Sequence, residues 1–413
     1  MSRTFVVVGG GVGGGTAAFA LRAAGFEGRI VLICDEPRPP YSKPPLSKGV
    51  LQGTEPVQRT AFRPDKWYVD KGIDLVTGVA VTELDADGHK LTLADGQLLG
   101  FDKLLLATGG TARSLPGVDA VDGVFTLRTV DDALAIKARL QAGARLVVVG
   151  AGFIGAEVAA SARTVGCEVT VLEGMDSPLQ RVLPKVLGEL YGQFHREHGV
   201  EVRTGIAISD LERQGEQVVA HAASGERFVA DAVVVGIGMV PNDSLAVKAG
   251  LAVDNGILVD ETCATSAPDI FAAGDVANAY HPLFGERMRV EHWQHAQHQA
   301  KAAALNMAGT PTPYEEVPWV WSDQYDLNLQ VAGLPQPDDD VHLRGDVDGR
   351  CFSAILTRNG AVTAAVAVNR ADDVRAVRRM LQARATIPLE VLADPGTDLT
   401  GLVEETLNRK DGR

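Results

Sequence analysis

At two places in the chain, a short apolar run is followed by clustered glycines and then by a segment of small residues. Residues 5–8 read Phe-Val-Val-Val, and residues 146–149 read Leu-Val-Val-Val. Uninterrupted β-branched runs of this length are typical of strands that are buried on both faces of a parallel sheet. The small-residue segments that follow favour helices. The pattern therefore predicts a strand, a tight turn and a helix, twice.

Both units continue in the same way. A second apolar run ends in an acid in each unit, at residues 30–35 and at residues 169–173. Each unit then has two short strand-like runs joined by a turn, Asp95-Gly96 in the first and Ser224-Gly225 in the second. A further buried strand follows each hairpin. We expect two βαβ modules, each extended by a short antiparallel excursion and a returning strand.

The pattern changes after about residue 325. Two alternating runs meet at Asn359-Gly360, a pair that favours a type I′ hairpin turn. A helix is expected to begin within residues 369–372, with apolar positions recurring along one face. The predicted fold class is α/β, with two Rossmann-like dinucleotide-binding domains and a C-terminal α+β domain.

The glycines in the two turns have the spacing of dinucleotide-binding sites. They are Gly9, Gly11 and Gly14 in the first unit, and Gly150, Gly152 and Gly155 in the second. In such turns the first glycine makes the tight bend, the second lets backbone amides approach a pyrophosphate, and the third lets the helix pack on the strand. Asp35 and Glu173 lie a little more than about 20 residues beyond the first glycine, as expected of an acid that binds a ribose.

Composition excludes several classes of function. The 413 residues, 46% of them hydrophobic and 22% charged, suit a globular protein of two or three domains. A net charge of −14 argues against nucleic-acid binding, and no apolar stretch is long enough to span a membrane. The cysteines are far apart in sequence and have no metal-ligand spacing, so we expect no metal site and buried thiols in a reducing cytosol. They are Cys34, Cys167, Cys263 and Cys351.

Further motifs, taken in order with the two glycine turns, resemble the two-dinucleotide-binding flavoprotein reductases. The resemblance is greatest to the NADH-dependent ferredoxin reductases of oxygenase systems, and it covers essentially the whole chain. The segments that carry it are Pro-Tyr-Ser-Lys-Pro-Pro-Leu-Ser-Lys at 40–48, Ala-Thr-Gly-Gly at 107–110, Phe-Ala-Ala-Gly-Asp at 271–275, Glu-His-Trp at 291–293 and Trp-Val-Trp-Ser-Asp-Gln at 319–324.

The resemblance assigns FAD to the first glycine turn. It implies that Lys43 lies along the adenosine and diphosphate half of FAD, although many members have Arg at this place, and that Lys48 reaches the isoalloxazine. Asp275 would bind the ribitol chain. The implied FAD-binding residues are Gly9, Gly11, Gly14, Asp35, Lys43, Lys48, Ala107, Thr108, Arg113, Arg128, Asp275, Trp293 and Trp321.

The resemblance assigns NADH to the second glycine turn. A carboxylate at Glu173 would bind a ribose 2′-OH and repel a 2′-phosphate, which favours NADH over NADPH. Glu157 matches a family glutamate that pairs with the lysine equivalent to Lys48, and these two are the candidate catalytic residues. Alternatively, Glu157 is a solvated acid that complements its helix dipole. The implied NAD-binding residues are Gly150, Gly152, Gly155, Glu157, Glu173 and Gly238.

The resemblance also implies the domain boundaries. The FAD-binding domain would comprise residues 1–112 and 243–324, the NAD-binding domain residues 113–242, and the C-terminal domain residues 325–413.

The implied activity is that of a cytoplasmic, FAD-dependent ferredoxin reductase. Hydride from NADH would pass to flavin N5, and electrons would leave one at a time for a [2Fe–2S] ferredoxin that serves a cytochrome P450 or a ring-hydroxylating oxygenase. An acidic ferredoxin would dock near Arg375, Arg378 and Arg379, although a solvated helix face would look the same.

Other activities compete with this interpretation. They are a rubredoxin reductase and a redox-signalling flavoprotein resembling apoptosis-inducing factor. A disulfide reductase or a cysteine-dependent peroxidase is disfavoured, because Cys34 would lie at the adenosine end of the first site, far from the reacting rings.

Overall fold

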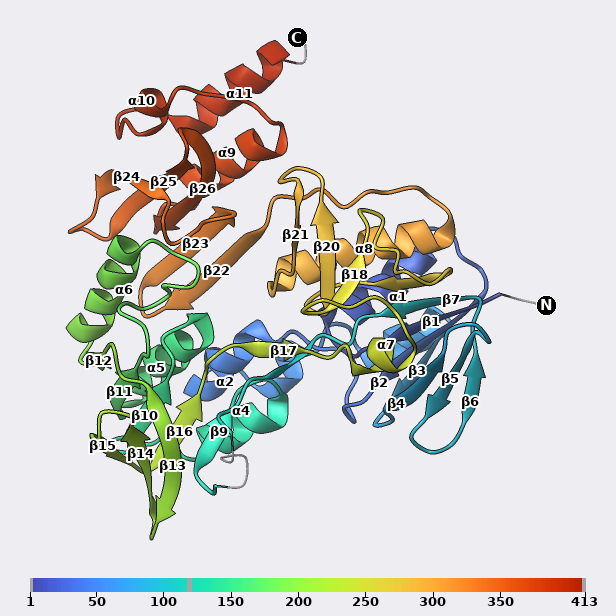
Figure 1. Ribbon diagram of the computed structural model, residues 1–413, viewed down its shortest axis with the longest axis horizontal. Coiled ribbons are helices and arrows are strands. Elements are labelled where there is room, and N and C mark those ends of the chain that lie inside the picture. The colour runs from blue at the N-terminus through green and yellow to red at the C-terminus, as the bar shows by residue number, and fades with distance from the viewer. Residues whose placement is uncertain (1–2, 117–120, 411–413) are drawn as a thin grey trace. The chain divides into compact units, whose positions relative to one another are not determined.

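The computed structural model describes residues 3–116 and 121–410, which form two compact units (Figure 1). Unit 1 comprises Met1–Lys43, Val57–Thr111 and Met239–Pro318. Unit 2 comprises Pro44–Pro56, Ala112–Gly238 and Trp319–Arg413. None of the described helices is both long and apolar enough to cross a membrane.

Unit 1 is built on a five-stranded parallel sheet of order β19-β7-β1-β2-β3. Its strands are β1 (Thr4–Val8), β2 (Arg29–Cys34), β3 (Ile73–Thr77), β7 (Lys103–Leu106) and β19 (Ile270–Ala272). Val6 pairs with Val31 on one side and with Leu104 on the other, and all three side chains are buried. The continuous apolar runs are therefore explained by cover on both faces of the sheet.

Helices α1 (Val12–Ala23) and α8 (Trp293–Ala308) pack together over one face of this sheet, with Phe5, Leu21 and Ala300 in the core between them (Figure 1). The other face is covered by smaller sheets and by α7. The remaining elements of unit 1 are η2 (Val57–Thr60), α3 (Asp65–Asp70), β4 (Val81–Asp85), β5 (Lys90–Leu93), β6 (Leu98–Gly100), β17 (Met239–Pro241), α7 (Ser244–Lys248), β18 (Ile257–Val259), β20 (Ala277–His281) and β21 (Glu286–Met288). Strand β8 (Gly110–Ala112) runs across the boundary of the units.

The first half of unit 2 repeats this design with a parallel sheet of order β12-β11-β10-β16-β9. Its elements are β9 (Val124–Thr126), α4 (Val130–Lys137), β10 (Arg145–Val149), α5 (Phe153–Val165), β11 (Glu168–Leu172), α6 (Lys185–Glu197), β12 (Glu201–Arg203), β13 (Ile208–Gln214), β14 (Gln217–Ala222), β15 (Arg227–Ala230) and β16 (Ala232–Val235). Strands β13, β14 and β15 form the expected antiparallel excursion before β16 returns to the parallel sheet.

The second half of unit 2 is an antiparallel sheet of order β22-β23-β26-β25-β24 with three helices. Its elements are β22 (Trp319–Gln324), β23 (Leu327–Gly333), β24 (Asp340–Asp346), β25 (Cys351–Arg358), β26 (Ala361–Val368), α9 (Ala371–Gln382), α10 (Leu389–Leu392) and α11 (Leu399–Lys410). Asn359 and Gly360 both have positive φ, as a type I′ turn requires. The predicted fold class is confirmed.

Each face of this antiparallel sheet has its own partner. Ile355 and Ala365 face a core that includes Val377 of α9 and Val403 of α11. Phe352 and its neighbours on the opposite face pack against side chains of α6. The sheet is therefore held against the second parallel sheet's helices by a continuous apolar core.

The two units divide the chain differently from the predicted domains at several places, and the predicted boundaries stay a prediction. Residues 44–56, which form η1 (Pro44–Ser47) and α2 (Gly49–Gln52), group with unit 2, and so do residues 319–324. The first segment packs on α5, where Ser161 Oγ donates a hydrogen bond to the Ser47 carbonyl at 2.7 Å. Lys48 is therefore in the same unit as the second glycine turn.

Candidate functional site

The first glycine turn is closed so tightly that two of its glycines have no room for a side chain. Gly9 has φ +128°, and a Cβ there would lie 2.0 Å from the Ala107 carbonyl oxygen. A Cβ on Gly14 would lie 1.9 Å from the Gly9 carbonyl oxygen. By contrast, a Cβ on Gly11 would meet nothing within 4 Å. The turn is packed on its protein side and open above Gly11.

The second turn repeats these contacts. Gly150 has φ +99°, and a Cβ on it would lie 2.5 Å from the Gly236 carbonyl oxygen. A Cβ on Gly155 would lie 2.1 Å from the Gly150 carbonyl oxygen, while Gly152 faces open space. Gly11 and Gly152 are also the N-caps of α1 and α5, and neither helix has a side-chain cap. Both turns thus leave helix N-terminal amides free to bind an anion such as a pyrophosphate.

The acids that follow the two turns have different surroundings. Asp35 is exposed, and its Oδ1 accepts a hydrogen bond from the Glu36 amide at 3.0 Å. Glu173 is half-buried, and its two carboxylate oxygens accept from the amides of Ala151 at 2.7 Å and Met175 at 2.9 Å. The second acid is therefore fixed against its own glycine turn, and the first is not.

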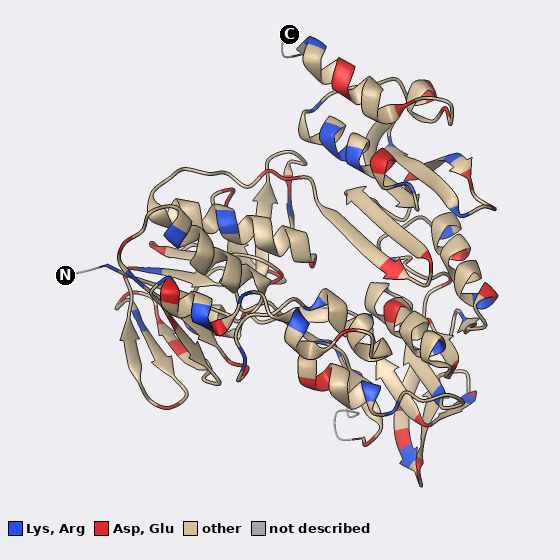
Figure 2. Ribbon diagram, turned by 180° about the vertical axis from the view of Figure 1, so that it is seen from behind, with Lys and Arg blue, Asp and Glu red and all other residues tan. Residues whose placement is uncertain are grey.

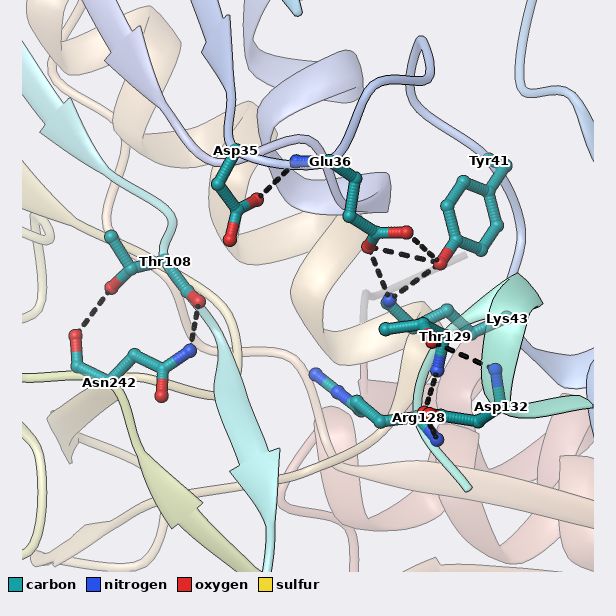
Figure 3. Close-up of polar contacts among 9 residues, drawn as sticks. All are labelled: Asp35, Glu36, Tyr41, Lys43, Thr108, Arg128, Thr129, Asp132 and Asn242. Atoms are coloured by element: carbon teal, nitrogen blue, oxygen red, sulfur yellow. Dashed lines mark hydrogen bonds and ion pairs between the residues drawn. The ribbon is translucent and has the colours of Figure 1, made fainter. Parts of the chain in front are cut away.

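Lys43 lies in a small polar cluster beside the first acid (Figure 3). Its Nζ is 3.4 Å from Glu36 Oε1 and 4.7 Å from the centre of the Tyr41 ring. The Tyr41 hydroxyl donates to Glu36 Oε2 at 2.7 Å. Glu36 directly follows Asp35 and Tyr41 lies within the 40–48 segment, but nothing in the sequence indicated that these two side chains meet.

Thr108 ties two distant segments of unit 1 together (Figure 3). Its hydroxyl donates to the Asn242 carbonyl at 2.8 Å, and Asn242 Nδ2 donates back to the Thr108 carbonyl at 3.0 Å. Thr111 Oγ1 adds a bond to Asn242 Oδ1 at 2.8 Å. The loop that follows β7 is therefore held in one conformation. Asn242 ends the 236–242 segment, which resembles the family's turn that closes the NAD-binding domain, but nothing in the sequence indicated its contact with Thr108.

Asp275 begins a polar group at the N-terminal end of α8. Arg289 Nη1 donates to the Asp275 carbonyl at 3.1 Å and pairs with Glu291 at 2.7 Å. His292 is the N-cap of α8 and precedes Trp293. Burial lowers the pKa of His292 to about 4, against the opposing effect of Asp275, so the imidazole is neutral at pH 7.

Glu157 is the most highly connected buried acid among the site residues. Its Oε1 lies 2.7 Å from Lys48 Nζ and accepts a hydrogen bond from Ser322 Oγ at 2.6 Å. Its Oε2 accepts from Ser47 Oγ. The residue is only 4% exposed, so it is not a solvated helix acid. Ser47 and Ser322 both lie in the quoted motifs, but nothing in the sequence indicated that they meet.

The remaining predicted residues of unit 2 also have clear local partners. Trp321 stacks on Trp319, with ring centres 5.2 Å apart and an interplanar angle of 22°. The Arg113 amide donates to the Gly238 carbonyl at 2.8 Å. The Arg128 amide donates to Asp132 Oδ2 at 2.9 Å, next to the Thr129–Asp132 capping box that starts α4 (Figure 3).

The cysteines offer no redox pair within the described residues, where all four are free. Burial, reinforced by the neighbouring acids, raises the pKa of the Cys34 thiol to about 12, so it stays protonated. Cys351 is exposed, contrary to the expectation that all four are buried, because it is the first residue of β25. No group of His, Cys, Asp or Glu in the described ranges could hold a metal.

Comparison with known proteins agrees with this geometry. The pyridine nucleotide-disulphide oxidoreductase family matches residues 3–300, and the reductase C-terminal family matches residues 319–403. A ferredoxin–NAD(+) reductase component of the anthranilate 1,2-dioxygenase system of Burkholderia cepacia is 42% identical over 405 residues, which cover 96% of this chain and 98% of that protein.

Two solved structures are similar over nearly the full length. The covalent complex of putidaredoxin reductase with putidaredoxin matches with a TM-score of 0.94 and 36% identity, covering 98% of this chain and 99% of that one. The ferredoxin reductase of the CYP199A2 system of Rhodopseudomonas palustris matches with a TM-score of 0.93 and 37% identity, covering 97% and 99%. The chain therefore belongs to the pyridine nucleotide-disulphide oxidoreductase family, among its ferredoxin–NAD(+) reductases.

Proposed function

We propose that the protein is an FAD-dependent, cytoplasmic reductase that takes electrons from NADH and passes them singly to a [2Fe–2S] ferredoxin. The ferredoxin would serve a cytochrome P450 or a ring-hydroxylating oxygenase. One observation carries the proposal: two open, uncapped glycine turns occur in one chain, and the helix of the second holds the buried Glu157, which pairs with Lys48. The similar ferredoxin reductases support the choice of acceptor.

The first turn has the features that FAD needs. The space above Gly11 and the uncapped N-terminus of α1 suit a pyrophosphate, and Asp35 is exposed for a ribose. When bound, FAD supplies the ring that accepts a hydride and returns electrons one at a time. The residues proposed to hold it remain Gly9, Gly11, Gly14, Asp35, Lys43, Lys48, Ala107, Thr108, Arg113, Arg128, Asp275, Trp293 and Trp321.

The second turn suits NADH. Each carboxylate oxygen of Glu173 accepts one backbone amide and retains capacity to accept a ribose hydroxyl. The same charge would repel the 2′-phosphate of NADPH. We assign the nicotinamide nucleotide to Gly150, Gly152, Gly155, Glu157, Glu173 and Gly238.

Glu157 and Lys48 are proposed to act at the reacting rings. A buried carboxylate is costly without a cation, so Glu157 holds the Lys48 ammonium at a fixed place. A fixed positive charge would stabilise negative charge that develops nearby during hydride transfer. Two hydroxyls also donate to Glu157, and among the described residues Lys48 is the cation that pairs with it.

The ferredoxin is proposed to dock on α9 near Arg375, Arg378 and Arg379. Acids lie among these bases (Figure 2). Arg375 pairs with Asp372 at 2.6 Å, and Arg379 pairs with Glu404 at 2.9 Å. These exposed pairs are weak, so an acidic partner can compete for the arginines.

Charge reversal tests this docking surface. Replacing Arg378 and Arg379 by Glu should lower ferredoxin-dependent turnover about tenfold at low salt, with a smaller effect at high salt. Reduction of ferricyanide by NADH should not change. Replacing Arg409, an exposed arginine of α11, is the matched control. Equal ferredoxin turnover in all three proteins would exclude docking at α9.

A redox-signalling role resembling that of apoptosis-inducing factor is the second candidate, since the paired Lys48 and Glu157 would serve both functions. Rubredoxin is the alternative acceptor. NADH-driven cytochrome c reduction with and without a [2Fe–2S] ferredoxin and a rubredoxin separates these cases. A large stimulation by ferredoxin alone is expected. A long-lived NADH-reduced state with neither acceptor reduced would favour signalling.

A further inference from the structure

The Glu157–Lys48 pair is the end of a longer chain of hydrogen bonds that runs through unit 2. Gln324 Nε2 donates to Ser322 Oγ at 2.9 Å, and Gln324 Oε1 lies 2.8 Å from His195 Nε2. His195 Nδ1 lies 3.2 Å from the Tyr325 hydroxyl. Gln324 and His195 are both buried. Neither residue belongs to the nucleotide site as proposed above.

The direction of every bond in this chain follows from its chemistry. A carboxylate only accepts, so Ser322 must give its proton to Glu157 and accept from Gln324. The Gln324 oxygen must then accept from His195, which places the imidazole proton on Nε2 and leaves Nδ1 to accept from Tyr325.

His195 can hold one tautomer over the physiological range. Burial lowers the pKa of His195 to about 4, although the hydrogen bond to Gln324 opposes the shift. The imidazole is therefore neutral at pH 7, with one donor and one acceptor. Donors aligned in one direction also polarise one another, so the charge on Glu157 is stabilised beyond its direct contacts.

The hydrogen-bond chain joins separate segments of unit 2. His195 belongs to α6, Ser322 and Gln324 belong to β22, and Glu157 belongs to α5. Gln324 and Ser322 are two residues apart on one strand, so their side chains lie on the same face of the sheet. The antiparallel sheet thereby controls the side chain of an acid in the helix of the second glycine turn.

We infer that Gln324 and His195 are positioning residues for hydride transfer. They hold the Ser322 hydroxyl on Glu157, and through it they fix the Lys48 ammonium before the nucleotide binds. This inference rests on the proposed function of Glu157 and Lys48. It predicts that the two residues affect the rate of hydride transfer and leave nucleotide affinity almost unchanged.

Matched variants separate positioning from packing. Gln324→Met retains the length of the side chain and removes both hydrogen bonds, and His195→Phe retains a ring without a donor. Both should slow NADH-dependent flavin reduction in stopped flow about tenfold, with NADH affinity changed less than about twofold. His195→Gln places an amide near the Nε2 position and should restore most of the rate. His221 lies on β14 and takes no part in the hydrogen-bond chain, so His221→Phe should leave the rate of flavin reduction unchanged.

Nitrogen NMR, first of the wild-type protein and then of one variant, tests the hydrogen-bond chain without relying on activity. With ¹⁵N-labelled histidine, His195 should be a neutral Nε2–H tautomer from pH 6 to 8, and Gln324→Met should change that signal. An Nδ1–H tautomer or a charged imidazole would overturn the inference. So would normal hydride transfer in both Gln324→Met and His195→Phe. If the wild-type flavin does not accept hydride from NADH, the proposed function fails instead, whatever the tautomer.

Discussion

The two glycine turns have nearly the same backbone and differ in the side chains around them. In both, the first and third glycines have no room for a Cβ and the second faces open space. The residue two positions beyond the third glycine of each turn shows the contrast. Thr16 stands two residues beyond Gly14, and Glu157 stands two residues beyond Gly155. The Thr16 hydroxyl has no hydrogen-bond partner within the described chain, whereas Glu157 has three donors.

This difference separates binding from chemistry. A shared backbone explains why both turns suit a dinucleotide, because free amides and the helix dipole can bind a pyrophosphate in each. Only the second helix carries a buried, paired charge. The same asymmetry appears in the strand-end acids, since Glu173 is fixed by two amides and Asp35 is exposed. We therefore propose that Glu157 and Lys48 of unit 2 act on the reacting rings.

The largest expected effect comes from closing one turn at a time. Gly155→Ala puts a Cβ 2.1 Å from the Gly150 carbonyl, so NADH-dependent flavin reduction should fall at least about 100-fold while FAD remains bound. Gly14→Ala should yield protein without FAD. The control is Gly100→Ala, where the nearest atom is 3.9 Å away. Visible absorbance gives FAD occupancy and stopped flow gives the rate. Loss of FAD from Gly155→Ala would contradict the assignment of FAD to the first turn and NADH to the second.

Removing the charge on Glu157 should have the next largest effect. Glu157→Gln keeps the shape of the side chain and leaves Lys48 without its carboxylate, so hydride transfer should slow roughly 10- to 100-fold. Thr16→Val in the equivalent place should alter the rate much less, because that hydroxyl makes no bond within the described chain. Single-turnover reduction by NADH measures both. Equal effects at the two positions would contradict the proposed division between the modules.

Glu173 should determine the choice of nucleotide. Glu173→Ala removes the proposed acceptor of the ribose hydroxyl and the charge proposed to oppose a 2′-phosphate, so the ratio of kcat/KM for NADH over NADPH should fall roughly 10- to 100-fold. Asp35→Ala should lower FAD affinity and leave this ratio unchanged. Steady-state kinetics with both nucleotides provide the check. An unchanged ratio in Glu173→Ala would rule out Glu173 as the selecting residue.

Mild acid should have the smallest effect. It should lower the stability of the folded state, and the loss should differ between the units. Burial lowers the pKa of His292 to about 4 and that of His295 to about 3 in unit 1, whereas the comparable residue of unit 2 is His195, at about 4. The unfolded chain binds these protons near pH 6.5, so it takes up more protons than the folded state below that pH. The stability that comes from keeping these imidazoles neutral is therefore fully present above pH 6.5, and it is lost as the pH falls toward 4.

Hydrogen exchange measures this difference. Between pH 7 and pH 5, and after correction for the intrinsic exchange rate, peptides from α8 should lose more protection than peptides from α6. Greater loss in α6 would contradict the assignment of the larger number of neutral, buried imidazoles to unit 1.

Local features of the fold could be predicted from the sequence, and long-range contacts could not. The two glycine turns and the Asn359-Gly360 hairpin depend on residues that are adjacent in the chain. The two hydroxyls that donate to Glu157 belong to residues 110 and 165 positions away from it, and no periodic pattern encodes such a meeting. The grouping of residues 44–56 with unit 2 was missed for the same reason, because it depends on packing against α5.

Anaerobic titration of the FAD-loaded protein with NADH in the presence of a [2Fe–2S] ferredoxin tests the central claim most directly. NADH delivers two electrons and the acceptor takes one, so one equivalent of NADH should reduce two equivalents of ferredoxin through the flavin. Gly155→Ala should fail at the first transfer while retaining FAD. Full reduction of the flavin by NADH with the ferredoxin left oxidised would contradict the account.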